Sequence, residues 1–482
     1  MAFVGIDLGT SSVKVLVLDQ TGRTLAHASR SYPLIGSRLG RAESDPEAWW
    51  SATCEAAREA VETSGTDVDA IGLSGQMHGV IVVDAAGTVL RHALTWADTR
   101  AAQQLKHYRR LAPHVRARLG NPLAPGMAGP LLLWLREHEP DVYKSAQFAL
   151  QAKDWLRLRL TGHVATDPSD ASATLLYDIE RDAWDLELVE EVGLRPDLLP
   201  PLQSSTEVAA GLRAHPAGEL GLTPGTPVVS GAADTACALV GAGVVAAGAL
   251  LNVGTGAQIA VPAVAAPTHP RLLTHAYRSA LQPPWYGMAA IQNAGFALDW
   301  VREALGASWD ELYEHSLRNV QPGAGGVTFL PQVIPERTPL VDGDAGAAWV
   351  GLRAGHGRLH LLRAALEGVA FAVREGIEAL EETGLAIDEV TASGGSMRRP
   401  LWRRLLAAVL ERPLVVSAEP AASARGAAVL AAIGVGATDA RLDRNVRAAE
   451  PGDLPGEDEI EACRAAYRLY LARTALLSRP HP

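Results

Sequence analysis

Two short turns rich in glycine and threonine are the first candidates for chemistry in this sequence. Each stands between two apolar segments that read as buried strands. Their residues are Gly9, Thr10, Ser11 and Ser12 in the first turn, and Gly254, Thr255 and Gly256 in the second. Such a turn directs backbone N–H groups and hydroxyls at one anion, as in backbone concavities that bind phosphate. An ordinary hairpin turn explains either one alone, but two such turns can clamp both ends of one polyphosphate.

Two aspartates stand at the ends of predicted strands. Asp7 precedes the first turn and can hold Mg²⁺ through water, since this cation prefers few carboxylates together with phosphate oxygens. Asp234 follows Gly231 and two alanines, so a substrate can approach it and it can accept a hydroxyl proton during attack on phosphorus. The alternatives are a solvated side chain for Asp7 and a helix N-cap for Asp234, and the capping role is compatible with catalysis.

Two further segments carry polar and aromatic groups. Residues 74–79 and 95–100 combine an aromatic face with hydrogen-bonding groups, as sugar sites do. Their candidate residues are Gln76, His78, Trp96, Asp98 and Arg100. A structural histidine and a core tryptophan are the competing interpretations, and no second His or Cys stands at a spacing that would make His78 a metal ligand. Gly394 and Gly395 can let an adenine ring lie flat, or form a left-handed turn. Residues 336–339 read as a surface loop.

The composition restricts the class of protein. The chain has 482 residues, and at roughly 100 to 200 residues per domain we expect two or three domains. Hydrophobic residues make up 48% and charged residues 20%, which excludes wholesale disorder. The net charge of −11 offers no footprint for nucleic acid or an anionic membrane. Three dispersed cysteines and an N-terminus unlike a signal peptide favour a cytoplasmic protein.

Strands alternate with helices along the chain, which predicts an α/β fold. Residues 3–18 form a hairpin, and helices are expected at 44–60, 359–380, 401–411 and 459–477. Residues 250–261 echo the opening hairpin, so the second half is interpreted as a diverged copy of the first. The apolar run 236–251 is shorter than the roughly 20 residues of a membrane-spanning helix and contains glycines. We interpret it as buried strand and turn.

In chain order these segments resemble the FGGY family of carbohydrate kinases, within the actin-like ATPase superfold. The resemblance runs from Val4 to about Gly436, and its most discriminating part is Gln76–Gly79. It rests on Ile6–Thr10, Ser74–Gly79, Leu94–Arg100, Lys153–Leu156, Asp167–Asp178, Asp234, Gly254–Gly256, Glu336–Pro339, Trp349–Leu352 and Gly394–Gly395.

The resemblance implies two actin-like (ribonuclease H-like) domains flanking a catalytic cleft, residues 1–242 and 243–482. It also implies ATP-dependent phosphorylation of D-xylulose on its terminal hydroxyl, with Mg²⁺. Carried over residue by residue, Asp234 is the general base, Asp7 holds Mg²⁺, and Met77 and His78 line the sugar pocket. The two turns bind the phosphates, Lys14 is placed to meet phosphate, and Gly394, Gly395 and Arg398 flank the adenosine.

Some residues depart from the family pattern, and these leave the acceptor open. Leu131 stands in place of a usual lysine, Ser396 in place of a third glycine, and Ala232 and Ala233 in place of glycines. Another ketose, a polyol or a sugar acid is therefore an alternative substrate, and a homodimer also stays open. A nucleotide-dependent sugar-binding protein without catalysis is the alternative from another class, and the sugar segments together with Asp234 argue against it.

Overall fold

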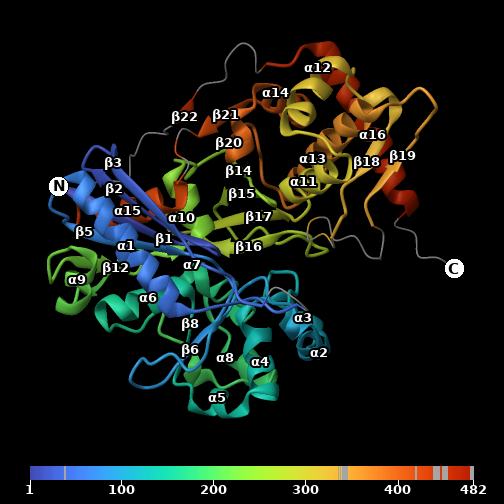
Figure 1. The fold of residues 1–482 in the computed structure, drawn as a ribbon. Helices are drawn as coiled ribbons and strands as arrows, with labels where there is room; N and C mark the ends of the chain where they lie inside the picture. The colour runs from blue at the N-terminus through green and yellow to red at the C-terminus, as the bar shows by residue number, and fades with distance from the viewer. Residues whose placement is uncertain are drawn as a thin grey trace.

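The computed structural model describes residues 1–36, 40–334, 336, 338, 346–417, 419, 421–437, 446–447 and 454–477. The chain folds into two halves, each built around a mixed sheet covered by helices (Figure 1). In the described ranges no helix is long and apolar enough to cross a membrane. The predicted α/β class is confirmed.

The first sheet begins with the predicted hairpin. β1 (Ala2–Leu8) pairs antiparallel with β2 (Ser12–Asp19), which pairs antiparallel with β3 (Thr24–Ser31). On its other edge β1 runs parallel to β5 (Ala70–Gly75), because helix α1 (Pro46–Ser64) provides the crossover. The sheet continues through β12 (Pro227–Val229) to β11 (Val208–Gly211), and β13 (Ala232–Ala233) also pairs with β5.

The second sheet repeats this order. Its hairpin is β14 (Ala249–Val253) and β15 (Ala257–Ala263), followed by antiparallel β17 (Trp285–Ile291) and β16 (His275–Arg278). On the other edge of β14, β20 (Val390–Ser393) and then β21 (Leu414–Ser417) run parallel to it, and β22 (Val446–Arg447) closes that edge. The order β17-β15-β14-β20-β21 corresponds to β3-β2-β1-β5-β12, so the weak sequence repeat reflects two halves of one architecture.

The predicted helices form close to their expected bounds. Asp45 caps α1 by accepting from the Glu47 N–H group, Pro46 is its first residue, and the helix ends at the left-handed Gly65. The second half contains α11 (Gly295–Ala304), α12 (Ser316–Asn319), α13 (Arg358–Glu381), α14 (Pro400–Leu410) and α16 (Glu457–Leu477), together with strands β18 (Thr328–Leu330) and β19 (Ala348–Val350).

The interpretation of residues 236–251 as strand and turn is wrong for its first part. Residues Asp234–Gly241 form helix α10, and only the end of the run belongs to strand β14. Helix α10 packs against α15 (Ala422–Gly434) so closely that a Cβ on Gly241 would lie 1.9 Å from the Ala422 carbonyl oxygen. Apart from the half-buried Asp234 and Ala238, every residue of α10 is buried, so the helix has no polar stripe. Its sequence therefore lacks the helical periodicity that would have identified it.

Helix α15 belongs to the second half of the chain but lies on the first sheet. A Cβ on Gly5 or Gly72 would lie 1.8 Å from the carbonyl oxygens of Ala424 and Ala427, respectively. In Figure 1, α10 and α15 lie between the two sheets. The two halves are therefore joined by helices in near backbone contact.

The remaining elements of the first half add a group of helices on one side of its sheet, below it in Figure 1. They include α4 (Ala128–His138), in which Leu131 is buried in an apolar core. The others are β4 (Glu43–Ser44), β6 (Ile81–Val83), β7 (Ala93–Leu94), α2 (Leu105–Arg110), α3 (Pro113–Ala117), α5 (Pro140–Ser145), β8 (Phe148–Leu150), α6 (Ala152–Thr161), α7 (Pro168–Ala171), β9 (Tyr177–Asp178), β10 (Ala183–Trp184), α8 (Leu186–Glu191) and α9 (Ala214–Leu220).

Candidate active site

The two predicted catalytic carboxylates stand at the same edge of the first sheet. Asp7 is the last residue but one of β1, and Asp234 directly follows β13. Strand β5 pairs in parallel with both strands. Ser74 on β5 lies opposite Asp7 on one side and Ala232 on the other. Its hydroxyl donates to Asp7 Oδ1 at 2.9 Å. The carboxyl ends of parallel strands are where α/β folds bind ligands.

Burial sets the protonation of both groups. It raises the pKa of Asp7, and the charge of Lys14 and the hydrogen bond from Ser74 act in the opposite direction. Burial, followed by the charge of Asp7, raises the pKa of Asp234 to about 7. Lys14 lies opposite Asp7 on β2 and bears on both carboxylates. A carboxylate with a pKa near neutrality is matched to general-base work.

Asp234 does not cap its helix, which corrects the alternative interpretation. Ala233 is the N-cap residue of α10, and Asp234 is the first helical residue. Its Oδ1 accepts from the Thr235 hydroxyl at 3.1 Å. A cavity of about 70 Å³ lies beside Asp234 and is lined from both halves, by residues that include Asn252, Gln258 and Ser423. The carboxylate therefore faces the junction of the two halves.

The first turn is held by side chains from neighbouring segments. The Gly9 N–H group donates to the Ser12 carbonyl at 3.1 Å, and the Gly9 carbonyl accepts from Tyr32 at 2.5 Å and from Gln76 Nε2 at 3.3 Å. Trp96 Nε1 donates to Thr10 Oγ1 at 2.8 Å. Gln76 and Trp96 thus support the turn, whereas we predicted contacts to the sugar, and those contacts stay a prediction.

The second turn is held by the start of helix α11. The N–H groups of Gly295 and Phe296 donate to the carbonyls of Gly254 at 3.1 Å and Thr255 at 2.8 Å. Within the turn, Gly254 N–H donates to the Gly256 carbonyl at 2.8 Å. Gly254 and Thr255 are exposed. The turn therefore has a fixed backbone and an accessible face.

Glu336 supports this arrangement from a segment that we interpreted as a surface loop. It is buried, and its carboxylate accepts from the backbone N–H groups of Gln292 at 2.5 Å and Asn293 at 3.2 Å, just before α11. Thr338 is fully buried as well, so the surface-loop interpretation is wrong for both residues. Arg337 and Pro339 lie outside the described residues. An isolated acid in a loop gives no sequence signal of burial, and so the role of Glu336 was missed.

Gly394 lies next to the second turn because β20 neighbours β14. Its φ of 111° and ψ of 164° lie outside the left-handed helical region, so the alternative of an αL turn is wrong. A Cβ there would lie 2.1 Å from the Val253 carbonyl oxygen, so only glycine fits. Gly395 begins a short 3₁₀ helix that ends at the exposed Arg398. The fold brings the predicted adenosine residues to the predicted phosphate turn.

The sugar segment is covered by strands of the second sheet. His78 has a φ of 74°, and its Nδ1 donates to the Ala173 carbonyl at 2.8 Å. Its ring lies 5.8 Å from that of Tyr277 on β16. On β17, the Tyr286 hydroxyl lies 3.8 Å from Met77 Sδ. These tyrosines were missed, because they are about 200 residues away in sequence and belong to strands whose local pattern shows only burial.

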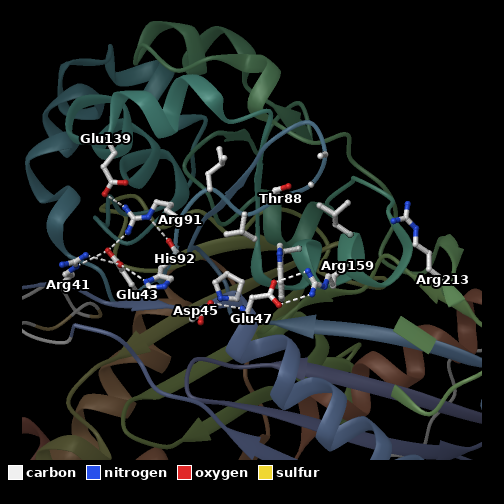
Figure 2. Close-up of a pocket in the computed structure, with 17 residues that line it drawn as sticks. Arg41, Glu43, Asp45, Glu47, Thr88, Arg91, His92, Glu139, Arg159 and Arg213 are labelled. Carbon is white, nitrogen blue, oxygen red and sulfur yellow. Dashed lines mark hydrogen bonds and ion pairs between the residues drawn. The ribbon is translucent and has the colours of Figure 1, made fainter. Parts of the chain in front are cut away.

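Asp98 and Arg100 belong to an ion-pair network. Arg100 Nη2 lies 2.7 Å from Asp98 Oδ2 and 2.6 Å from Glu43 Oε1, and Asp98 Oδ2 accepts from the Ala42 N–H group at 3.0 Å. Glu43 also pairs with Arg41 and Arg91 in a cavity of about 760 Å³ that neither Asp7 nor Asp234 lines (Figure 2). The charges of Asp98 and Arg100 already have protein partners, and their contact with a sugar stays a prediction.

The residues around Asp7 fit a magnesium ion. No group of three or more His, Cys, Asp or Glu side chains in the described part of the chain is arranged to hold a metal by itself. Mg²⁺ is commonly bound by one or two carboxylates and substrate phosphates, without a full protein cage. Asp7 lies beside the first turn and provides such a carboxylate. Its Oδ1 accepts a hydrogen bond from the Ser74 hydroxyl.

Comparison with known proteins shows the same two units along the chain. Residues 2–241 match the N-terminal domain of the FGGY family of carbohydrate kinases, and residues 249–435 match its C-terminal domain. The xylulose kinase of Bacillus subtilis is 34% identical over 441 residues, 90% of this chain and 88% of that one.

Solved structures agree over nearly the whole chain. A xylulose kinase from Rhodospirillum rubrum has a TM-score of 0.91 and 29% identity, with 99% of each chain covered. A gluconate kinase from Lactobacillus acidophilus has a TM-score of 0.92 and 26% identity, covering 99% of this chain and 98% of that one. Proteins that share this fold at such coverage are thus named for different acceptors.

Proposed function

Because the chain belongs to the FGGY family of carbohydrate kinases, we propose that it transfers the terminal phosphoryl group of ATP to D-xylulose, giving D-xylulose 5-phosphate. The observation that carries the proposal is the pair Asp7 and Asp234 at strand ends on either side of β5, with a Gly-Thr turn in each half. The match to the xylulose kinase of Bacillus subtilis supports the choice of acceptor.

In this proposal Asp234 accepts the proton of the terminal sugar hydroxyl as that oxygen attacks phosphorus. Burial and Asp7 keep the pKa of Asp234 at about 7, so the group is a stronger base than an exposed carboxylate and is still ionised at mildly alkaline pH. Asp234 is half-buried beside a cavity lined from both halves, and exclusion of water when the substrates bind would remove a competitor of the sugar hydroxyl. Phosphoryl transfer depends chiefly on positioning and charge stabilisation, and the two turns provide fixed backbone donors.

Asp7 and the phosphate oxygens would hold Mg²⁺, which supplies charge neutralisation on the transferred group when bound. Lys14 adds a positive charge near both aspartates. Gly394, Gly395 and Arg398 are the proposed adenosine contacts, next to the second turn.

Met77, His78 and Gln76 are the proposed sugar contacts. The ring of His78 is fixed by its bond to Ala173, and Met77 is fixed against Tyr286. Gln76 Oε1 is buried and has no hydrogen-bond partner in the described part of the chain. Buried polar atoms are nearly always satisfied, and a sugar hydroxyl would satisfy this one.

A sugar acid is the second candidate acceptor, since a gluconate kinase is as similar in fold as the xylulose kinase. The test is an ADP-release assay with D-xylulose, other pentuloses, hexuloses, polyols and gluconate. We expect the highest kcat/KM with D-xylulose. A higher value for gluconate or a polyol would refute the acceptor and leave the family unchanged. Asp234→Asn, purified in parallel, controls for a contaminating kinase.

A non-catalytic sugar-binding protein makes a different prediction in the same experiment. Calorimetry would then show that sugar and ATP bind while no ADP or sugar phosphate forms. A cytoplasmic location is also proposed, and a homodimer is tested by light scattering of the purified chain.

A further inference from the structure

A fully buried polar chain lies directly behind Asp234. We infer that Ser169, oriented by Asp167, is a positioning residue that fixes the backbone leading into Asp234. This inference rests on the proposed role of Asp234 as the base. Ser169 belongs to α7, and it touches neither the Gly-Thr turns nor Met77 and His78 through any hydrogen bond of the described residues.

This series of polar contacts begins at Lys153 on α6. Its Nζ lies 2.7 Å from Asp154 Oδ1, 2.9 Å from Asp167 Oδ1 and 3.0 Å from Asp170 Oδ2. All four side chains are fully buried. Buried ionic groups cost desolvation and seldom improve stability over well-packed apolar residues. Their presence beneath the predicted site is consistent with a task other than stability.

Asp167 connects this ionic cluster to two serines. Its Oδ2 accepts from Ser169 Oγ at 2.5 Å and from Ser205 Oγ at 2.8 Å. Burial acts to raise the pKa of Asp167, but the charge of Lys153 and these hydrogen bonds hold it below its usual value. An ionised Asp167 can only accept hydrogen bonds.

Ser169 connects Asp167 to the backbone before Asp234. Its single hydroxyl proton is donated to Asp167, so its oxygen is left to accept, and it accepts from the Ala233 N–H group at 2.9 Å. Ala233 lies opposite Gly75 on β5 and is the N-cap residue of α10, immediately before Asp234. The cap has no side-chain hydrogen bond of its own. Asp167 and Ser169 therefore set where the peptide before Asp234 lies.

Ser205 provides a matched control. Ser169 and Ser205 are both buried serines that donate to the same oxygen of Asp167, but only Ser169 bonds to Ala233. Ser169→Ala and Ser205→Ala each remove one hydroxyl from the same cluster. A purely structural role predicts similar effects on both stability and activity.

The experiment compares kcat, KM for both substrates and the urea midpoint of the two variants. We expect Ser169→Ala to lose about 10- to 100-fold in kcat, since small misplacements of a catalytic group have effects of that size. KM for sugar and for ATP should stay within about two-fold, because the altered contact does not reach either predicted pocket. Ser205→Ala should keep kcat within about two-fold at a similar urea midpoint.

Normal kcat in Ser169→Ala, or an equal loss of kcat in both variants, would overturn the inference. Asp234→Asn separates this outcome from a failure of the proposed function. If Asp234→Asn is inactive and Ser169→Ala is fully active, only the positioning role is wrong. If Asp234→Asn keeps normal turnover, the base assignment is wrong and the inference falls with it.

Discussion

Replacing Asp234 by asparagine should make the protein more stable at neutral pH while abolishing catalysis. Asp234 is half-buried, and both the desolvation of its carboxylate and the charge of Asp7 disfavour its ionised form. Asparagine has the same shape and carries no charge. Ionised Asp234 therefore lowers the free energy of unfolding of the wild type, and the uncharged variant does not have this cost.

The size of this effect follows from the shift in pKa. The pKa of Asp234 rises from 3.8 to about 7. Three units correspond to about 4 kcal/mol, at about 1.4 kcal/mol per unit. As pH rises from 4 to 7 the unfolded state loses this proton before the folded state does, so the wild type loses stability over that window. The advantage of Asp234→Asn should therefore grow from about zero at pH 4 to about 4 kcal/mol above pH 7.

The assay is urea unfolding of both proteins from pH 4.5 to 8.5, without nucleotide or divalent cation. Titrating groups that do not interact with Asp234 are common to both proteins and cancel in the difference, whereas the coupling between Asp7 and Asp234 is part of the effect that is measured. Asp197→Asn, at an exposed carboxylate whose pKa is lowered by Arg195, is the control and should not gain stability with rising pH. A difference between wild type and Asp234→Asn that does not change with pH would refute the argument that burial and Asp7 raise the pKa of Asp234.

Three further predictions concern activity. kcat/KM should fall about ten-fold per pH unit below about pH 7, because Asp234 must be ionised to accept a proton; a profile flat to pH 5 would contradict this. Trp96→Phe removes the hydrogen bond to Thr10. The loss of about 1 kcal/mol should raise KM for ATP about five-fold. A change confined to the KM for sugar would instead favour the predicted sugar contact of Trp96. Gly394→Ala should destabilise the protein by about 1–3 kcal/mol and weaken ATP binding in calorimetry, whereas Gly384→Ala, at positive φ in open space, should weaken stability alone.

The sequence predicts those parts of the site that have local signals. The strand-turn-strand pattern around Gly9 and Gly254 was sufficient to predict the position of both turns. The predicted strands were sufficient to place Asp7 and Asp234 near strand ends. What it could not predict are contacts across the fold. Gln76 bonds to Gly9, and Tyr286 reaches Met77 only because the two sheets meet there.

The α10 segment shows why one error was unavoidable and why it bears on catalysis. The residues that follow Asp234 are uncharged, and all of them except the half-buried Ala238 are buried, so they show neither helical nor strand periodicity. Gly241 and Gly426 allow its backbone to touch that of α15, and α15 in turn lies against Gly5 and Gly72 of the first sheet. The small residues that make α10 hard to recognise in the sequence also allow α15, from the second half, to pack tightly against α10, the helix that begins with Asp234. A bulkier residue at Gly241 or Gly426 should therefore displace the start of α10 and lower kcat, even though neither glycine lines the cavity beside Asp234.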